Sequence, residues 1–399
     1  MAKIVILGYK PLHTNRSGYE KPLLASAKIF SDLGYEVQLL SFGNDNGHVL
    51  TRDGLKEYTI KQQYPEEGLS VLRLIDFLTL FLFGYKRSIM QLNNNVKMLE
   101  ALSNENPDII VHGDFILPHI LAKYKSIHNS VKIISYSDEP KIILTSFNSI
   151  YSIPNTIRKF VPPVLLTRLK RKYVRYSSTL YNKTIAVSDA IITPTNLDKK
   201  AILRLIQHSK KIFVIPPVSV DKKDLKHPKK ITSIKRVAFI GAYSFWPNRE
   251  AINLIETKIA PLCPKQIFLI AGTGCPKLKH KNIQYVGYVP DIKKFFDTVD
   301  LCIAPIVTGT GMKNKIMDYF LYKKPTIGTS LAFEGYNVRN RENAIVEDDI
   351  NLFYTHIYEL NNDTKLLFHI QQAAHEPIKH LTETKIKSKW KIVLDYALR

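Results

Sequence analysis

The residues of this chain that are best suited to chemistry lie in one short stretch, which contains Gly309, Gly311, Lys313, Lys315 and Asp318. Glycine lets the backbone approach a bound group closely, and each lysine adds a full positive charge. A carboxylate one to two helical turns further on can accept hydrogen bonds from a pair of ribose hydroxyls. This combination suits a nucleoside diphosphate. It differs from a Walker loop, which ends in Gly-Lys-Ser/Thr, and from the GxGxxG fingerprint of dinucleotide sites.

The same stretch is predicted to join a buried strand to a helix. The apolar run Leu301–Pro305 is typical of a strand, and helical residues begin near Met312. The turn therefore lies at the carboxyl end of a parallel strand, beside the free N–H groups and the positive dipole end of a helix, and both attract phosphate. A Gly-x-Gly turn alone is equally compatible with an ordinary structural turn.

The rest of the chain predicts two α/β domains that position this turn. Short apolar runs such as Lys3–Gly8 alternate with helical stretches in the first half, and the same order restarts at Val237–Gly241. The length of 399 residues suits two domains. We expect an N-terminal domain, a lysine-rich linker, a C-terminal domain and a terminal helical segment at residues 1–218, 219–235, 236–370 and 371–399.

The C-terminal segment has one apolar helical face, formed by Ile386, Trp390, Val393, Leu394, Ala397 and Leu398. Because this face follows a complete second domain, we expect the helix to pack back across the domain junction. The alternative is a helix that simply caps its own domain.

The second half also carries a series of motifs, at 239–242, 246–248, 268–274, 286–291, 299–305, the Gly-x-Gly-x-Lys-x-Lys loop, and 324–329 leading to Glu334 and Gly335. In this order they resemble the carboxyl-terminal domain of GT-B glycosyltransferases, specifically retaining enzymes of glycosyltransferase family 4. The first half resembles the family more loosely, at Ser17-Gly18, Gly34–Val37 and Asp189–Thr195. The resemblance implies an α/β GT-B fold of two facing Rossmann-like, doubly wound parallel-sheet domains.

The resemblance assigns donor-binding roles by position. Gly309, Thr310, Gly311, Met312 and the two lysines would hold the donor diphosphate. Asp318 would bind the ribose, although the family usually has the longer glutamate at that position. Thr310 takes the place of a glutamate that contacts the sugar in many members.

The remaining donor contacts that the resemblance implies lie on loops of both domains, at Ser17, Gly18, Gly241, Trp246, Asn248, Tyr288 and Val289. Tyr288 and Val289 fall where the nucleotide base usually rests. The Gly241 loop lacks the family's frequent arginine and downstream lysine, and Trp246, Asn248 or Arg249 would replace them.

The catalytic side gives a weaker signal. Many family members carry a histidine where this chain reads Tyr136-Ser-Asp138, so Asp138 is the candidate group near the reacting carbon and Tyr136 the second candidate. His112 and Asp114 end a neighbouring predicted strand and are candidates on the acceptor side. A histidine at a strand end is more often structural.

The resemblance also implies how the reaction would proceed. In retaining enzymes of this type no enzyme nucleophile is established, and the leaving diphosphate can itself take the proton of the acceptor. Lys313 and Lys315 would then be catalytic, because they stabilise the leaving group without a metal. The acidic run Glu347–Asp349 is expected to be a solvated turn rather than a metal site. No cofactor is expected besides the nucleotide sugar, which is a co-substrate.

A formal net charge of +22 points to an anionic partner. Basic and apolar residues interleave over 158–176, a mixture that favours attachment to an anionic membrane surface, with the apolar run 77–83 as a companion anchor. The alternatives are a solvated basic face and an ordinary core helix. Nucleic acid is a less favoured partner, because helix-turn-helix, zinc-finger and RNA-platform signatures are missing.

These patterns together predict a retaining, metal-independent hexosyltransferase that moves a sugar from a nucleotide-diphosphate donor to a hydroxyl acceptor, such as a lipid-linked or cell-surface glycan. The alternatives are a non-catalytic scaffold of the same fold at the membrane, an epimerase, and transfer to a modified nucleic-acid base. Three cysteines without metal or disulfide spacing fit a reducing compartment. We therefore expect a cytoplasmic protein attached peripherally to the inner face of the membrane.

Overall fold

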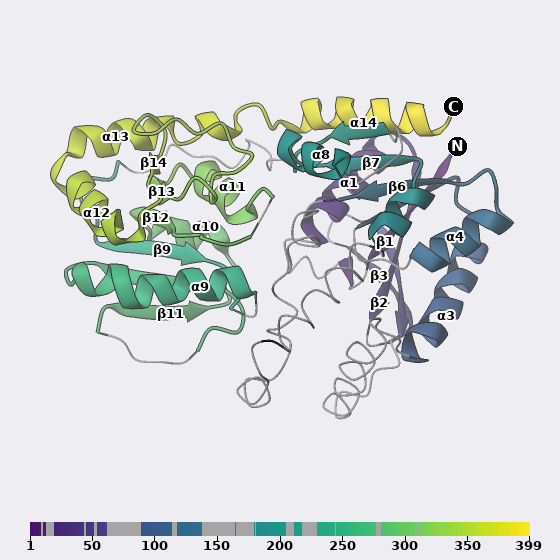
Figure 1. Cartoon of the computed structure of the whole chain (residues 1–399), viewed down its shortest axis with the longest axis horizontal. Helices are drawn as coiled ribbons and strands as arrows, with labels where there is room; N and C mark the ends of the chain where they lie inside the picture. Colours follow the sequence, from purple (N-terminus) through teal and green to yellow (C-terminus); the bar gives the residue numbers. More distant parts are fainter. Residues whose placement is uncertain are drawn as a thin grey trace. The chain divides into compact units, whose positions relative to one another are not determined.

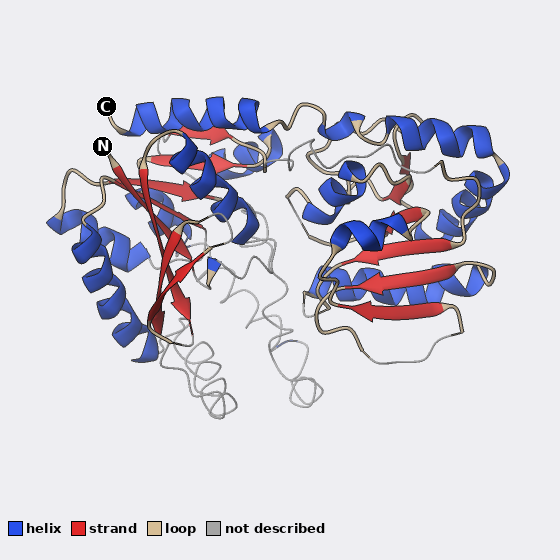
Figure 2. Ribbon diagram, turned by 180° about the vertical axis from the view of Figure 1, so that it is seen from behind, coloured by secondary structure: helices blue, strands red, loops and turns tan. Residues whose placement is uncertain are grey.

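The chain folds into two α/β units in the computed structural model (Figure 1). The first unit comprises Met1–Pro217 together with Lys387–Arg399, and the second comprises Val218–Ile386. Each unit combines a sheet of mostly parallel strands with helices, as Figure 2 shows, which confirms the predicted fold class. The structure describes residues 1–8, 11–12, 20–43, 45–51, 54–61, 89–113, 118–137, 164, 179, 181–204, 211–217, 230–243, 245–276, 281–309 and 311–399.

In the described part of the chain, eight strands form the sheet of the first unit, in the order β3-β4-β2-β1-β5-β6-β7-β8. They are β1 (Lys3–Gly8), β2 (Glu36–Gly43), β3 (Gly47–Leu50), β4 (Lys56–Lys61), β5 (Ile109–Gly113), β6 (Lys132–Tyr136), β7 (Ala190–Thr193) and β8 (Lys211–Val214). Neighbouring strands run parallel except β3 and β4. The aliphatic runs of the central strands are buried, as parallel strands covered by helices require.

The helices described in the first unit are α1 (Glu20–Asp32), α3 (Ile89–Glu105), α4 (Pro118–Ile127) and α8 (Asn196–Leu203). α1 stops before Gly34, whose φ of 88° is the left-handed conformation that ends many helices. Leu102 of α3 and Leu121 of α4 pack with Ile110 and Ile133 on one face of the sheet. These apolar contacts hold β5 and β6, which carry two of the predicted acceptor-side residues.

The C-terminal helix α14 (Glu383–Ala397) packs on the first unit, although it follows the second unit in the sequence (Figure 1). Trp390 meets Phe30 of α1 edge to face, with ring centroids 4.9 Å apart. Lys387 donates to the carbonyl of Asp32, and Lys389 donates to the carbonyl of Val214. The apolar face therefore returns the chain to its first unit, which is the first of the two placements that the sequence left open.

In the second unit, six described strands form a sheet in the order β11-β10-β9-β12-β13-β14. They are β9 (Arg236–Ile240), β10 (Ile267–Ala271), β11 (Ile283–Gly287), β12 (Leu301–Ala304), β13 (Thr326–Gly328) and β14 (Ile345–Val346), all parallel. The helices are α9 (Trp246–Leu254), α10 (Ile292–Asp297), α11 (Asn314–Leu321), α12 (Phe353–Asn362) and α13 (Thr364–Ala373).

The strand order of the second unit is that of a Rossmann fold, 3-2-1-4-5-6. In such sheets the connections leave in opposite directions from the two central strands, here β9 and β12, and open a crevice beyond their carboxyl ends. The loops after these two strands, 241–245 and 305–313, are therefore the expected ligand-binding loops. The second contains the glycine and lysine stretch that the sequence singled out.

The structure adds strands that the sequence patterns did not predict. β3, β4, β8 and β14 all lie at or next to a sheet edge, where strands are short and only partly buried. The helix that follows the glycine turn begins at Asn314, two residues later than Met312, because Lys313 is still extended with φ −87° and ψ 109°.

Candidate functional site

The glycine turn of the second unit packs against the start of α9. A Cβ atom added to Gly309 would lie 3.6 Å from Pro247, and the Oγ1 of Thr308 donates to the carboxylate of Glu250 at 2.5 Å. The loops after β9 and β12 thus meet at the switch point of the sheet, where ligands bind in this class of fold.

Lys315 is the central cation of this site. It lies in the first turn of α11, and its Nζ donates to the Oδ1 of Asn248 at 2.5 Å and lies 4.1 Å from the centroid of the Phe239 ring. Among the described residues, no carboxylate forms an ion pair with it. Burial, and after it the charge of Lys313, lower the pKa of Lys315 from 10.5 to about 7. An anion is the ligand that this environment lacks.

Asn248 connects the lysine to the loop after β9. Its side chain is 7% exposed, and its Nδ2 donates to the carbonyl of Ala242 at 2.9 Å while its Oδ1 accepts from Lys315. The amide fits only because position 241 is glycine: an added Cβ would lie 2.5 Å from the Cγ of Asn248. Two predicted donor contacts, Gly241 and Asn248, therefore act together.

The loops after β9, β10 and β11 are hydrogen-bonded in series along the same sheet edge. The N–H of Gly241 donates to the carbonyl of Ala271, and the N–H of Gly272 donates to the carbonyl of Gly287. Tyr288 follows at the end of this series with 62% of its surface exposed. It presents an aromatic ring at the edge where the resemblance expects the base.

Lys313 differs from Lys315 because it has a carboxylate partner. Its Nζ lies 3.5 Å from Glu334, and its carbonyl accepts from the hydroxyl of Tyr336 at 2.9 Å. Lys313 is also the residue before α11, and its own side chain does not cap the first N–H groups of that helix. These N–H groups add to the positive potential of the turn.

The other residues of the second unit that are predicted to bind the donor lie in different surroundings. Asp318 lies on α11, one turn beyond Lys315, and its charge helps to raise the pKa values of Tyr336 and Cys302, after burial as the main cause for both. Met312 and Val289 are partly buried against the core, whereas Trp246 begins α9. Thr310 lies outside the described residues.

On the first unit, the structure describes only two of the predicted residues. His112 is fully buried at the end of β5, its Nδ1 lies 2.8 Å from the carbonyl of Gly113, and its Nε2 has no hydrogen-bond partner among the described residues. Burial lowers the pKa of His112 to about 4, so the ring is neutral at pH 7. Tyr136 is buried with its ring stacked 6.3 Å from Trp390.

Four predicted residues of the first unit, Ser17, Gly18, Asp114 and Asp138, lie outside the described residues, as does the basic segment 158–176 apart from Val164. No helix within the described ranges is both long enough and apolar enough to cross a membrane.

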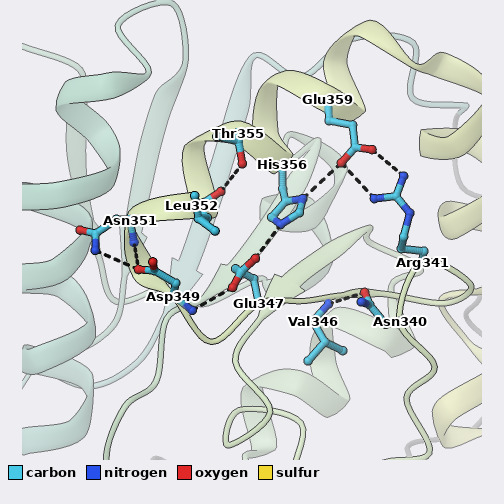
Figure 3. A network of polar contacts seen from close by, with 10 residues as sticks. All are labelled: Asn340, Arg341, Val346, Glu347, Asp349, Asn351, Leu352, Thr355, His356 and Glu359. Atoms are coloured by element: carbon cyan, nitrogen blue, oxygen red, sulfur yellow. Dashed lines mark hydrogen bonds and ion pairs between the residues drawn. The ribbon is translucent and has the colours of Figure 1, made fainter.

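The acidic run Glu347–Asp349 takes part in a hydrogen-bonded network (Figure 3), while Asp348 and Asp349 are exposed to solvent. The Nε2 of His356 lies 3.0 Å from Glu347, and its Nδ1 lies 3.2 Å from Glu359, which also binds Arg341. The ring of His356 thus links Glu347 to Glu359. Among the described residues, no group of three or more potential metal ligands gathers in one place.

Sequence reasoning missed two carboxylates of the site. Glu250 and Glu334 reach the glycine turn from α9 and from the loop after β13. The only signal in the sequence was that Glu334 belongs to a motif with Gly335. Nothing in that motif showed that its side chain meets Lys313.

Comparison with known proteins finds one family model that matches the part of the chain that contains this site. Residues 234–363 match the family described as Glycosyl transferases group 1. No curated protein matches the sequence. The matched range contains every donor-binding residue predicted on the second unit.

Solved structures are similar over nearly the whole chain. One is a sucrose-phosphate synthase from Thermosynechococcus elongatus, with a TM-score of 0.68 and 12% identity over 99% of this chain and 98% of that one. An S. aureus TarM variant in complex with fondaparinux, alpha-GlcNAc-glycerol and UDP has a TM-score of 0.67 and 12% identity over 100% of both chains. Anabaena HepE in complex with UDP and glucose has a TM-score of 0.65 and 13% identity over 99% of this chain and 100% of that one.

These identities are low, so the similarity describes the fold, whereas the family match describes the second unit. Both agree with the resemblance that the motifs suggested. Residues 234–363 therefore match the glycosyl transferases group 1 family, in a chain whose two parallel-sheet units have the GT-B fold.

Proposed function

We propose that this protein transfers a sugar from a nucleoside-diphosphate sugar to a hydroxyl acceptor, with retention of anomeric configuration. The observation that carries the proposal is Lys315, a largely enclosed cation beside a neutral amide and an aromatic ring, at the switch point of a Rossmann sheet. The HepE and TarM structures contain UDP, which favours a uridine nucleotide as the donor's leaving group.

In this proposal the second unit holds the donor. Lys315 and Lys313 bind the diphosphate, Asp318 the ribose, and Tyr288 and Val289 the base. As the bond between the anomeric carbon and the diphosphate oxygen breaks, negative charge grows on the leaving group. A preorganised ammonium group beside that oxygen stabilises the charge most at the transition state. The two lysines supply this charge themselves, so we expect the rate to be unchanged after treatment with EDTA.

The acceptor belongs to the first unit in this proposal. The acceptor hydroxyl attacks the anomeric carbon, and its proton passes to the leaving diphosphate, with Asp138, Tyr136, His112 and Asp114 as the candidate polar groups nearby. Ser17 and Gly18 would contact the donor from the loop after β1. We propose a hexose as the transferred sugar, and a lipid-linked or cell-surface glycan as the acceptor.

A membrane-bound acceptor would place the protein at the cytoplasmic face of a membrane. The net charge of +22 and the interleaved basic and apolar residues of 158–176 support this. Flotation with vesicles containing anionic lipid should carry the protein upward, and added salt should release it. Equal recovery with neutral and anionic vesicles would remove the membrane from the proposal.

A panel of UDP-, GDP- and CMP-sugars tests the function itself. We expect wild-type protein to release nucleotide from one donor class, and Lys315→Ala to lower the turnover rate by about 100-fold or more. Lys294→Ala is the matched control, because the Lys294 side chain is 86% exposed on the same unit. Nucleotide binding without release from any donor would instead favour a non-catalytic scaffold.

A further inference from the structure

Glu334 is an enclosed carboxylate at the donor edge of the second unit that has no role in the function proposed above. It lies in the loop after β13, and its side chain is 9% exposed. Its carboxylate lies 3.5 Å from the Nζ of Lys313, whose side chain is 10% exposed. Both charges are therefore largely withdrawn from water.

Stability alone does not explain such a pair. Removing two charges from water costs free energy that a good ion pair barely recovers, and apolar residues of similar size often stabilise a protein more. A strong charge-assisted contact measures about 2.7–2.9 Å. The contact between Lys313 and Glu334 is longer, at 3.5 Å, so it is weaker than a strong charge-assisted contact.

The loop that carries Glu334 is fixed to the glycine turn. The Oγ1 of Thr329 donates to the carbonyl of Ile306 at 2.6 Å, and the hydroxyl of Tyr336 donates to the carbonyl of Lys313 at 2.9 Å. Asp348 accepts from the backbone and the side chain of Ser330, each at 2.8 Å. The carboxylate of Glu334 is thus held in place before any ligand arrives, which is the property of a recognition group.

The two lysines of the turn are consequently unequal. Lys315 has only a neutral amide and a ring as partners in the described structure, whereas Lys313 has Glu334. The negative charge of a bound diphosphate would balance the positive charge of Lys315. The carboxylate of Glu334 can only accept hydrogen bonds. It therefore suits the hydroxyl groups of a ligand and repels a second negative charge.

We propose that Glu334 determines which sugar the donor carries. Its carboxylate accepts hydrogen bonds from hydroxyls of a neutral sugar, while Lys313 is shared between Glu334 and the diphosphate. A uronate sugar is disfavoured, because its own carboxylate would meet that of Glu334. This inference rests on the proposed function and adds the substrate class to it.

The test compares Glu334→Gln with Glu334→Ala and wild type. Glu342→Gln is the matched control, since Glu342 forms an exposed ion pair with Arg339 in the same segment. The assay uses the neutral and uronate sugars of the nucleotide that wild type accepts, UDP-glucose and UDP-glucuronate if that nucleotide is UDP. Affinity for UDP alone and the melting temperature are measured in parallel.

For Glu334→Gln we expect kcat/KM with the neutral donor to fall about tenfold or more, as when a hydrogen bond to a charged group is lost. UDP affinity should stay within twofold of wild type or become tighter. The preference for the neutral donor over the uronate should shrink at least fivefold. Glu334→Ala should behave similarly, and Glu342→Gln should match wild type.

The inference is overturned if active wild type and Glu334→Gln have the same donor preference, or if Glu334→Gln loses affinity for UDP in step with its loss of kcat/KM. The second outcome would mean that Glu334 only maintains the diphosphate site. A wild-type protein that releases nucleotide from no donor would overturn the proposed function itself. The wild-type measurement alone therefore distinguishes the two failures.

Discussion

Lys315 shows how a single enclosed charge can serve binding at the expense of stability. Its ammonium group is desolvated beside Asn248 and Phe239, and the charge of Lys313 is close by. These surroundings disfavour the protonated form in the free protein. They favour it again once an anion is bound, so protonation and binding are coupled.

The coupling makes stability depend on pH. The pKa of Lys315 falls from 10.5 to about 7, so between these values the unfolded chain holds a proton that the folded chain lacks, and stability rises with pH. Lys315→Met should therefore melt several degrees above wild type at pH 7, and the difference should shrink towards pH 10. Thermal melting over that range provides the measurement. A variant that melts below wild type at pH 7 would contradict this reading.

Donor binding should depend on pH in the opposite direction. The protonated form of Lys315 binds a diphosphate more tightly than the neutral form. Above pH 7 the free protein must therefore take up a proton at Lys315 on binding, and UDP affinity should weaken by up to about tenfold per pH unit. Calorimetric titration with UDP at pH 8, in buffers of different ionisation enthalpy, measures the uptake. No proton uptake, or the same uptake in Lys315→Met, would exclude Lys315 as the coupled group.

At the scale of elements, the donor edge depends on close contact between successive loops. A Cβ at Gly272 would lie 2.1 Å from the carbonyl oxygen of Gly241, and Gly272 has φ of 146°. A Cβ at Gly241 would instead meet the side chain of Asn248, which can move. A substitution at Gly272 would therefore clash with rigid backbone. A substitution at Gly241 would clash with the side chain that accepts a hydrogen bond from Lys315.

The two glycines should therefore respond differently to substitution. Gly272→Ala should lower the melting temperature by several degrees, since overpacking costs about 1–3 kcal/mol. Gly241→Ala should have the smaller effect on melting and should weaken UDP binding by displacing Asn248. Melting curves and UDP titrations of both variants measure these effects. If Gly241→Ala lowered the melting temperature more than Gly272→Ala, the loops would not be arranged as described.

The network around His356 joins the residue after β14 to α12 through hydrogen bonds. The hydrogen bond from His356, as the largest cause, holds the pKa of Glu347 below its usual 4.5, and Arg341 does the same for Glu359. This stabilisation is present above pH 4.5 and is lost as the pH falls further. His356→Gln should cost about 1 kcal/mol at pH 6, and less at pH 3.5. Urea unfolding at both pH values tests this, and an equal cost at both would refute it.

At the scale of the whole molecule, α14 makes the first unit depend on the last residues of the chain. Trp390 is 2% exposed and packs on Phe30, so its removal leaves a large cavity in the first unit. Trp390→Ala should destabilise that unit by about 3–5 kcal/mol. UDP affinity should be largely retained, because the residues proposed to bind the diphosphate through lysine, the ribose and the base all lie in the second unit. Calorimetry and UDP titration separate these effects, and a parallel loss of UDP affinity would contradict the division.

The sequence by itself determined the local features of this protein. Aliphatic runs such as Ile109–Val111 need burial on both faces, so they predict strands of a parallel sheet. The glycines and lysines of 309–315 predict an anion-binding turn for equally local reasons. The motif order was specific enough to predict the GT-B fold, which the structure and the comparisons confirm.

Only the tertiary structure decided which distant groups meet. The contact between Lys315 and Asn248 joins residues 67 positions apart, and that between Lys313 and Glu334 joins residues 21 apart. It also decided that α14 covers the first unit, because an apolar helical face alone has no preference among apolar partners. Side-chain partners and docking surfaces depend on the sheet order and on packing between segments, and no local pattern in a sequence specifies either.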